Sequence, residues 1–169
     1  MPKRPFYALP ILLGIIGICL GGCVSGTVST VFYKDPPHPR MFYVISPDSR
    51  DPTNRNISNL IEAKMSERGY TKALSFEAAN IGVLFQYSVD PTGSVVSDGT
   101  AVTTSYPRRF QILVIDLQKS KLPEKVEPIW QGEIYSAGTS QNISRLAPIF
   151  VEQVFSKYGE TVTNQRFSH

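Results

Sequence analysis

Apolar and polar residues alternate from Ile81 to Val89, which is the period of a β-strand with one buried face. In 109–117 both alternating sets are apolar, so the pattern predicts a central strand whose two faces are both covered. Three more stretches are rich in β-branched and aromatic residues and predict further strands: 28–33, 41–46 and 129–139. The chain is therefore expected to build a β-sheet.

A first amphipathic helix is predicted over residues 52–68, where apolar side chains recur at 3.6-residue spacing. Asp51 suits the N-cap and Pro52 suits the first helical position. Gly69 is a natural stop, because glycine adopts the left-handed conformation that ends many helices. The apolar stripe of this helix is expected to pack on the sheet.

A second apolar stripe at helical spacing runs from Ile143 to Phe155 and is interrupted by Pro148. Proline is costly inside a helix and is accommodated in its first turn. Two alternatives therefore remain open: a helix kinked at Pro148, or a turn followed by a helix over residues 148–158.

These elements predict an α+β fold, with a mainly antiparallel sheet of four to six strands and two helices packed on one face. A single domain is expected over residues 28–160, followed by a frayed tail at 161–169. Residues 93–107 are rich in Ser, Thr, Gly and Val. They form either a small hairpin on a primed turn at Asp98-Gly99 or a mobile loop.

Residues 1–22 have the pattern of a secretory signal peptide. Lys3 and Arg4 make a cationic start, and an apolar run follows over residues 6–20. The alternative is an uncut membrane anchor. Length argues against it, because a span needs about 20 apolar residues and this run is shorter.

The leader ends in Leu20-Gly21-Gly22-Cys23, which resembles the lipobox of bacterial lipoproteins. The resemblance implies cleavage before Cys23, acylation of its thiol, and a lipidated cysteine with a short tether at residues 23–27. Because Val24 and not aspartate follows, it also implies the outer membrane, with the domain facing the periplasm. Cys19 follows the bulky Ile18 and is expected to leave with the signal peptide.

Cleavage changes what the composition indicates. The leader carries Lys3 and Arg4 and no acid, so 17 basic residues fall to 15 against 14 acidic ones and the formal net charge falls from +3 to +1. A near-neutral domain gives no electrostatic reason to expect nucleic acid as a partner. With Cys23 acylated and Cys19 removed, no disulfide is expected, so packing has to stabilise the fold.

Candidate site chemistry is sparse. The two histidines, His38 and His169, are too few for a zinc or iron site, so no metal and no cofactor is expected. No nucleophile elbow or phosphate-binding loop is present, and we expect no enzyme activity. Asp116 is an acid inside an apolar strand; the pattern favours a carboxylate that ends its strand over a catalytic acid. Trp130 is expected in the core.

Several features together resemble a family of bacterial envelope lipoproteins known only as a domain of unknown function. They are the lipobox, the strands Leu113-Val114-Ile115-Asp116-Leu117 and Pro128-Ile129-Trp130-Gln131-Gly132, and the terminal amphipathic helix. The resemblance covers most of 41–158. Asn80 stands where the family usually has an acid, and residues 93–107 are an insert. The family implies no catalytic residue.

The strand at 109–117 predicts a binding surface, because two helices can cover only one face of its sheet. The residues on the other face are Gln111, Leu113, Ile115 and Leu117. Soluble monomers seldom leave such a patch open. The candidates to cover it are residues 93–107, a second copy of the chain, or an envelope partner. We favour a partner surface that residues 93–107 partly shield.

The expected function is that of a lipid-anchored cell-envelope lipoprotein acting as a binding or assembly module. The partners implied are membrane lipid, through acylated Cys23, and an envelope protein or a second copy. One alternative is a carrier of a small apolar ligand or lipid, which predicts a cavity around Trp130 and Phe85. A less favoured alternative is an envelope hydrolase, for which the sequence offers only Asp116 and His38.

Overall fold

The computed structural model describes residues 24–97, 99, 101–121 and 123–169. The predicted signal peptide and Cys23 lie outside the described residues. The elements are β1 (Ser25–Phe32), β2 (Met41–Ile45), α1 (Pro52–Glu67), β3 (Thr71–Lys72), β4 (Ile81–Val89), β5 (Ser94–Ser97), β6 (Val102–Asp116), β7 (Pro128–Gly138), α2 (Ile143–Phe155) and β8 (Val162–Ser168).

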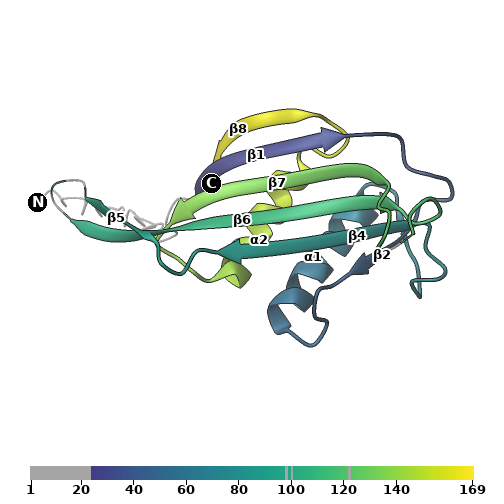
Figure 1. Ribbon diagram of the computed structural model, residues 1–169, viewed down its shortest axis with the longest axis horizontal. Helices are drawn as coiled ribbons and strands as arrows, with labels where there is room; N and C mark the ends of the chain where they lie inside the picture. The colour runs from purple at the N-terminus through teal and green to yellow at the C-terminus, as the bar shows by residue number, and fades with distance from the viewer. Residues whose placement is uncertain (1–23, 98, 100, 122) are drawn as a thin grey trace, which may run out of the picture.

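The strands form one eight-stranded sheet in the order β3-β2-β4-β6-β7-β1-β8, with β5 paired to the outer part of β6 (Figure 1). Strand β2 runs parallel to β3 and β4, and the other pairs are antiparallel. The α+β class is confirmed. The sheet is mainly antiparallel, as predicted, but it is mixed, and the predicted number of four to six strands was wrong because the sheet has eight. The parallel pairing follows from the crossover through α1, which returns the chain beside β2.

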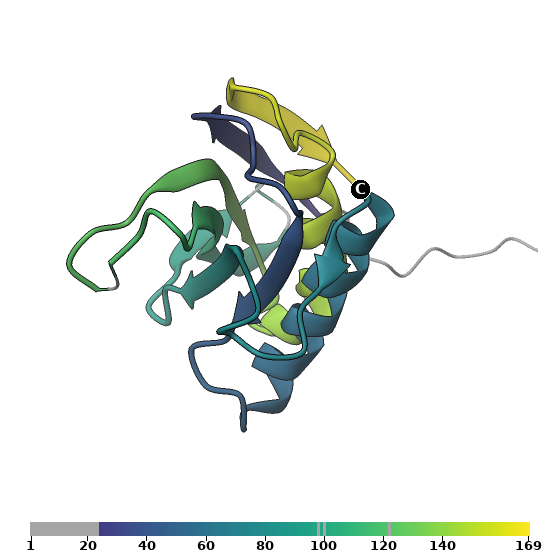
Figure 2. The same ribbon diagram turned by 90° about the vertical axis from the view of Figure 1, so that its right-hand side faces the viewer.

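Both helices lie on the same face of the sheet and leave the other face uncovered (Figure 2). The core fills the space between them. It combines the buried side of α1, the buried side of α2 and every second residue of the central strands, including Phe42, Phe110, Trp130 and Phe150. Burial of this apolar surface is the main favourable term for folding.

Local signals set the bounds of α1. The Asp51 carboxylate accepts a hydrogen bond from the Thr53 N–H at 2.6 Å, and Pro52 occupies the first turn. Gly69 follows the helix with φ of 78°, a conformation that glycine adopts without steric cost. The helix predicted at 52–68 is thus confirmed to within one residue.

Helix α2 begins at Ile143 and continues through Pro148. Asn142 caps it by accepting a hydrogen bond from the Arg145 N–H at 3.2 Å. The alternative in which the helix starts at Pro148 is therefore wrong. Pro148 is exposed, and the stripe of seven buried apolar residues on the other side holds the helix against the sheet despite the missing N–H.

The two ends of the described chain are both part of the sheet. Val24 is buried, and its N–H and C=O pair with those of His169 at 3.0 and 2.9 Å. The tether predicted at 23–27 was wrong, because β1 starts at Ser25. The frayed tail predicted at 161–169 was also wrong, since β8 pairs with β1 as an edge strand. Its exposed polar residues give no apolar alternation for a sequence pattern to detect.

Strands β5 and β6 pair as a hairpin, so the hairpin alternative is confirmed over the mobile loop, while Asp98 of the predicted primed turn lies outside the described residues. Strand β5 pairs with β6 from Ser94 opposite Ser105 to Ser97 opposite Val102. Gly93 begins the hairpin with φ of 58°, and a Cβ there would lie 3.0 Å from the Tyr106 ring. The hairpin projects beyond the end of the sheet and does not fold back over it (Figure 1).

Candidate functional site

The face of the sheet opposite α1 and α2, here called the open face, is where the sequence predicts a binding surface. Pairing across β4, β6 and β7 brings its side chains into three rows. The rows are Leu84, Leu113 and Gln131; Gln86, Gln111 and Glu133; and Ser88, Arg109 and Tyr135. The open face is therefore a mixture of apolar and polar side chains, and not the largely apolar patch that 109–117 predicts.

The middle row is a chain of hydrogen bonds across three strands. Gln86 donates to Gln111, whose amide donates to the Glu133 carboxylate at 2.9 Å. Arg109 forms an ion pair with the same carboxylate through Nε and through Nη2, the latter at 3.0 Å. The Arg109 guanidinium lowers the pKa of Glu133 below its ordinary value, with a smaller contribution from Gln111. This row is thus held in a fixed geometry with its donors and acceptors directed along the sheet.

A hollow of about 250 Å³ lies beside this row. Its lining combines Leu84 and Leu113 with the amides of Gln86, Gln111 and Gln131. An apolar floor with a few fixed polar groups is the usual composition of a recognition site, although this hollow is smaller than most ligand pockets. Two of the predicted binding residues, Gln111 and Leu113, therefore line a real concavity.

Ile115 and Leu117 have a different environment. They pack together with Ile45 over Gly82, where an added Cβ would lie 3.0 to 3.2 Å from all three side chains. Ile115 is fully buried in this way, and Leu117 is partly buried. The prediction that both faces of this strand are covered is confirmed at Ile115, and a glycine on the neighbouring strand lets the side chains close over it. The assignment of Ile115 to a partner surface was wrong, because Ile115 is not accessible. The described residues of 93–107 lie at the other end of β6 from this cluster.

Leu117 lines a second, larger groove at the opposite end of the sheet from the β5–β6 hairpin. The groove has a volume of about 560 Å³ and lies between the loop that precedes β4 and the loop that follows β6. Phe76 and Asn80 belong to its lining. Asn80 is buried, accepts a hydrogen bond from the Met41 N–H at 3.0 Å and donates to the Pro39 carbonyl. Its amide thus ties β2 to β4, and the bond to the Pro39 carbonyl needs an amide, because an ionised carboxylate cannot donate.

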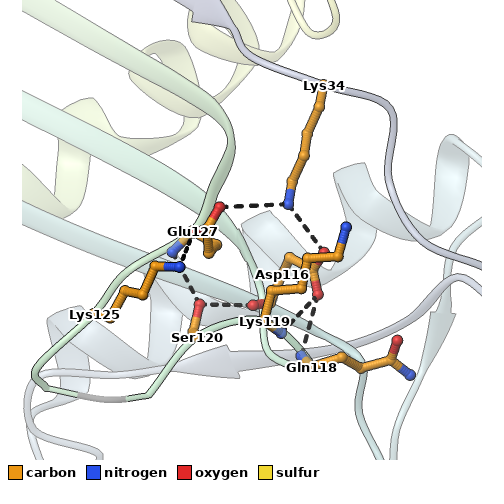
Figure 3. Close-up of polar contacts among 7 residues, drawn as sticks. All are labelled: Lys34, Asp116, Gln118, Lys119, Ser120, Lys125 and Glu127. Carbon is orange, nitrogen blue, oxygen red and sulfur yellow. Dashed lines mark hydrogen bonds and ion pairs between the residues drawn. The ribbon is translucent and has the colours of Figure 1, made fainter.

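Asp116 lies at the end of β6, with its side chain only 3% exposed (Figure 3). Its carboxylate accepts hydrogen bonds from the Lys34 ammonium at 3.0 Å, from the Gln118 N–H at 3.1 Å and from the Lys119 N–H at 3.3 Å. The interpretation of Asp116 as a residue that ends its strand and accepts hydrogen bonds from the following loop is confirmed. Three donors satisfy the charge that burial would otherwise destabilise.

The loop after β6 extends this network. Ser120 donates to the Asp116 carbonyl at 2.6 Å and accepts from the Glu127 N–H at 3.0 Å (Figure 3). Glu127 pairs with Lys125 at 2.6 Å, and its pKa is lowered chiefly by that ammonium. The contacts around Asp116 thus fasten the β6–β7 loop to the sheet.

The remaining candidate residues are dispersed. His38 is exposed in the loop between β1 and β2, and within the described ranges no hydrogen bond joins it to Asp116. Trp130 is fully buried and contacts the rings of Phe155 and Tyr158, so its predicted place in the core is confirmed. Phe85 lines the smaller of the two hollows described above and Trp130 lines neither, so a cavity around both residues, as the carrier hypothesis predicts, stays a prediction.

Metal-binding groups and membrane-spanning helices are both absent from the part of the chain that the structure describes. No group of three or more His, Cys, Asp or Glu side chains there is arranged to hold a metal ion. Neither of the two helices described is long and apolar enough to cross a bilayer.

The polar row on the open face is the feature that sequence reasoning missed. Its signal was present as polar residues at alternate positions of strands that are otherwise apolar: Gln86 in β4, Gln111 in β6 and Glu133 in β7. These residues are neighbours only because β4, β6 and β7 are adjacent in the sheet. The alternation of residues along a single strand does not give the order of the strands.

The fold and this site define an α+β domain whose mixed sheet has one face covered by two helices and one open face. Residues 31–158 match the family described as "Domain of unknown function (DUF4136)". The chain belongs to this family, which confirms the predicted resemblance to a family known only as a domain of unknown function. No curated protein matches the chain.

Three solved structures are similar to it. A PDZ domain protein from Parabacteroides distasonis has 13% identity and a TM-score of 0.59, over 86% of this chain and 38% of its own. A DUF4136 family protein from Bacteroides thetaiotaomicron has 15% identity and a TM-score of 0.47, over 80% and 97%. The PelC dodecamer from Paraburkholderia phytofirmans has 14% identity and a TM-score of 0.46, over 82% and 99%. At 13% identity, the similarity to the Parabacteroides distasonis protein shows only that the two chains share a fold.

Proposed function

We propose that this protein is a lipid-anchored lipoprotein of the bacterial cell envelope that acts as a binding or assembly module. The observation that carries the proposal is the Leu20-Gly21-Gly22-Cys23 ending of an apolar, basic leader. The fold supports it, because β1 begins at Ser25, two residues after the cysteine. All of the described strands and helices therefore follow the proposed cleavage site.

The binding surface in this proposal is the open face. Its hollow and its fixed polar row offer shape and directed hydrogen bonds, whereas the other face is occupied by α1 and α2. Gln111 takes part in the row and lines the smaller hollow, so we place it at the centre of the surface. Because Ile115 is buried, the accessible members of the predicted set are Gln111, Leu113 and Leu117.

A photocrosslinking amino acid at Gln111 or Leu113 is expected to capture one discrete envelope partner or a second copy of the chain in intact cells. The matched control is the same probe at Arg55, which is exposed on α1 and faces away from the open face. Equal capture at all three positions, or only intramolecular products at the first two, would contradict the assignment of the open face.

We also propose that the protein is not an enzyme. Asp116 is fully engaged in fastening the β6–β7 loop, and His38 lies in an exposed loop. His38→Ala and Asp116→Asn are therefore expected to leave the cellular phenotype intact at normal protein level. Asp116→Asn keeps Oδ1 for the two loop N–H groups. It loses the hydrogen bond from the Lys34 ammonium, because the amide NH2 that replaces Oδ2 is a donor, at a cost of about 1.5–3 kcal/mol.

The measurement is complementation of a deletion strain, with a blot for abundance and thermal melting of the purified variants. Complete loss of function from either variant at normal abundance and unchanged melting temperature would overturn the non-enzymatic proposal.

A further inference from the structure

The β5–β6 hairpin projects from the end of the sheet at which the described chain begins. Gly26 in β1 and Arg108 in β6 both lie opposite Ser136 in β7. Counting two residues back along β1 and β6 places Val24 level with Tyr106 at the base of the hairpin. The chain enters the sheet and the hairpin leaves it at one end of the molecule (Figure 1).

The hairpin extends well past this level. Val102 lies four positions before Tyr106, so along an extended strand it is roughly 13 Å beyond the level of Val24. Cys23 is the residue before Val24, so its α-carbon lies within about 3.8 Å of that of Val24. If acyl chains on Cys23 hold this end at a bilayer, the hairpin reaches the lipid before the rest of the domain does.

The described part of the hairpin exposes three valines among uncharged serine and threonine residues. Val95, Val96 and Val102 are 74%, 49% and 72% exposed. None of the described residues from 91 to 107 carries a charge. Pairing of β5 with β6 places Val95 and Val102 on one face of the ribbon and Val96 on the other. A protein partner docked against one face of the hairpin would leave the other face exposed to water, whereas fluid lipid can surround both faces.

We propose that the β5–β6 hairpin is a second membrane contact, which enters the boundary between lipid headgroups and acyl chains and fixes the orientation of the domain. This inference rests on the proposed lipid anchor at Cys23. Asp98, the single acid in the sequence of this segment, restricts the contact to the interfacial zone, because a carboxylate is costly in hydrocarbon. Tyr106 at the base of the hairpin is of the residue type enriched at that boundary.

Two exposed arginines at the same end attract an anionic lipid surface, and the exposed Asp90, whose N–H donates to the Pro107 carbonyl, opposes them with one negative charge. Arg166 in β8 lies opposite Thr27 near the start of β1, and Arg145 lies in the first turn of α2. Each basic residue close to an anionic leaflet adds an attraction that weakens within a Debye length. The membrane-facing end thus combines apolar side chains that enter the interface with cations that meet its phosphate groups.

The test uses the lipidated full chain in vesicles of phosphatidylethanolamine and phosphatidylglycerol. Because Cys19 leaves with the leader and Cys23 is acylated, a single new cysteine is the only free thiol for an environment-sensitive fluorophore. The variants are Val95→Cys and Val102→Cys, with Leu74→Cys as the matched control. Leu74 is fully exposed and apolar, and it precedes β4 at the opposite end of the sheet. All three positions are exposed, so labelling leaves the core unchanged.

At Val95 and Val102 the fluorophore is expected to be quenched by lipids spin-labelled near the top of the acyl chain. Quenching by aqueous iodide should be at least about fivefold weaker there than at Leu74, because the interface excludes the anion. Equal iodide access at all three positions, in protein that floats with the vesicles, overturns the inference and leaves the anchor intact.

Two other outcomes would also overturn the proposed membrane contact of the hairpin. Protection from iodide without quenching by the lipid label means that another protein copy covers the hairpin, and this overturns the membrane contact. Protein that fails to acquire acyl chains, and fails to float, overturns the proposed function and the inference that rests on it.

Discussion

Replacing Cys23 with alanine is expected to abolish acylation and to leave either an uncut precursor, which keeps its apolar leader, or a soluble product. Without the thiol, no acyl chain is added to the lipobox-like ending, and cleavage at that site is not expected. Two or three acyl chains give near-permanent membrane residence, whereas a single chain binds only marginally. Detergent phase separation and gel mobility of the protein from growing cells measure both effects.

The chain offers a matched control in Cys19→Ala, because Cys19 follows Ile18 and leaves with the leader. This variant is expected to behave like the parent protein. Full partition of Cys23→Ala into the detergent phase at the processed size would contradict lipidation at Cys23. Fractionation of the parent protein is expected to recover it with the outer membrane, and recovery only with the inner membrane would contradict the role assigned to Val24.

An anchor at Cys23 has a mechanical consequence that the predicted tether would not have had. Val24 is already buried and paired with His169, so no flexible segment separates the sheet from the acylated residue. A domain attached in this way has little freedom to reach distant partners. Its open face is expected to meet partners that lie close to the same membrane.

The sequence predicted the elements whose signals are local. Helix α1 was predicted at both ends, because Asp51 and Gly69 act within one turn of the helix. The strand β4 was predicted because one of its faces is covered and the other is polar. The mixed pairing of β2 and the edge strand β8 were not predicted, because neighbours distant in the chain decide them and β8 is too polar to alternate.

The candidate site shows the same division. Asp116 ends its strand as predicted, since its partners Gln118 and Lys119 follow it directly in the chain. The pattern predicted that both faces of this strand are covered, but not that Ile115 is covered by the chain itself, because that depends on Gly82 of a neighbouring strand. A pattern within one strand gives the apolar face, and only the pairing of strands shows what covers it.

The second large effect is expected at Gly132, the glycine of the Trp130-Gln131-Gly132 segment. A Cβ there would lie 2.5 Å from Cγ1 of Val154 in α2 and 2.6 Å from the ring of Trp130. Both neighbours are fully buried, so neither has free space to move into. Gly132→Ala is expected to lower the free energy of unfolding by about 1–3 kcal/mol, the usual cost of overpacking a close-packed core. Urea unfolding followed by fluorescence of Trp130, the only tryptophan, measures it.

A double-mutant cycle with Val154→Ala identifies the cause. On its own, Val154→Ala removes buried methyl groups and is expected to destabilise the fold by about 1–3 kcal/mol. Combined with Gly132→Ala it also removes the clashing Cγ1, so the new methyl group partly fills the space that Val154 vacates. The double variant is therefore expected to be more stable than the sum of the two single changes predicts, by about 1 kcal/mol or more. Strict additivity, or a neutral Gly132→Ala, would show that the glycine is not needed for helix α2 to pack closely against β7.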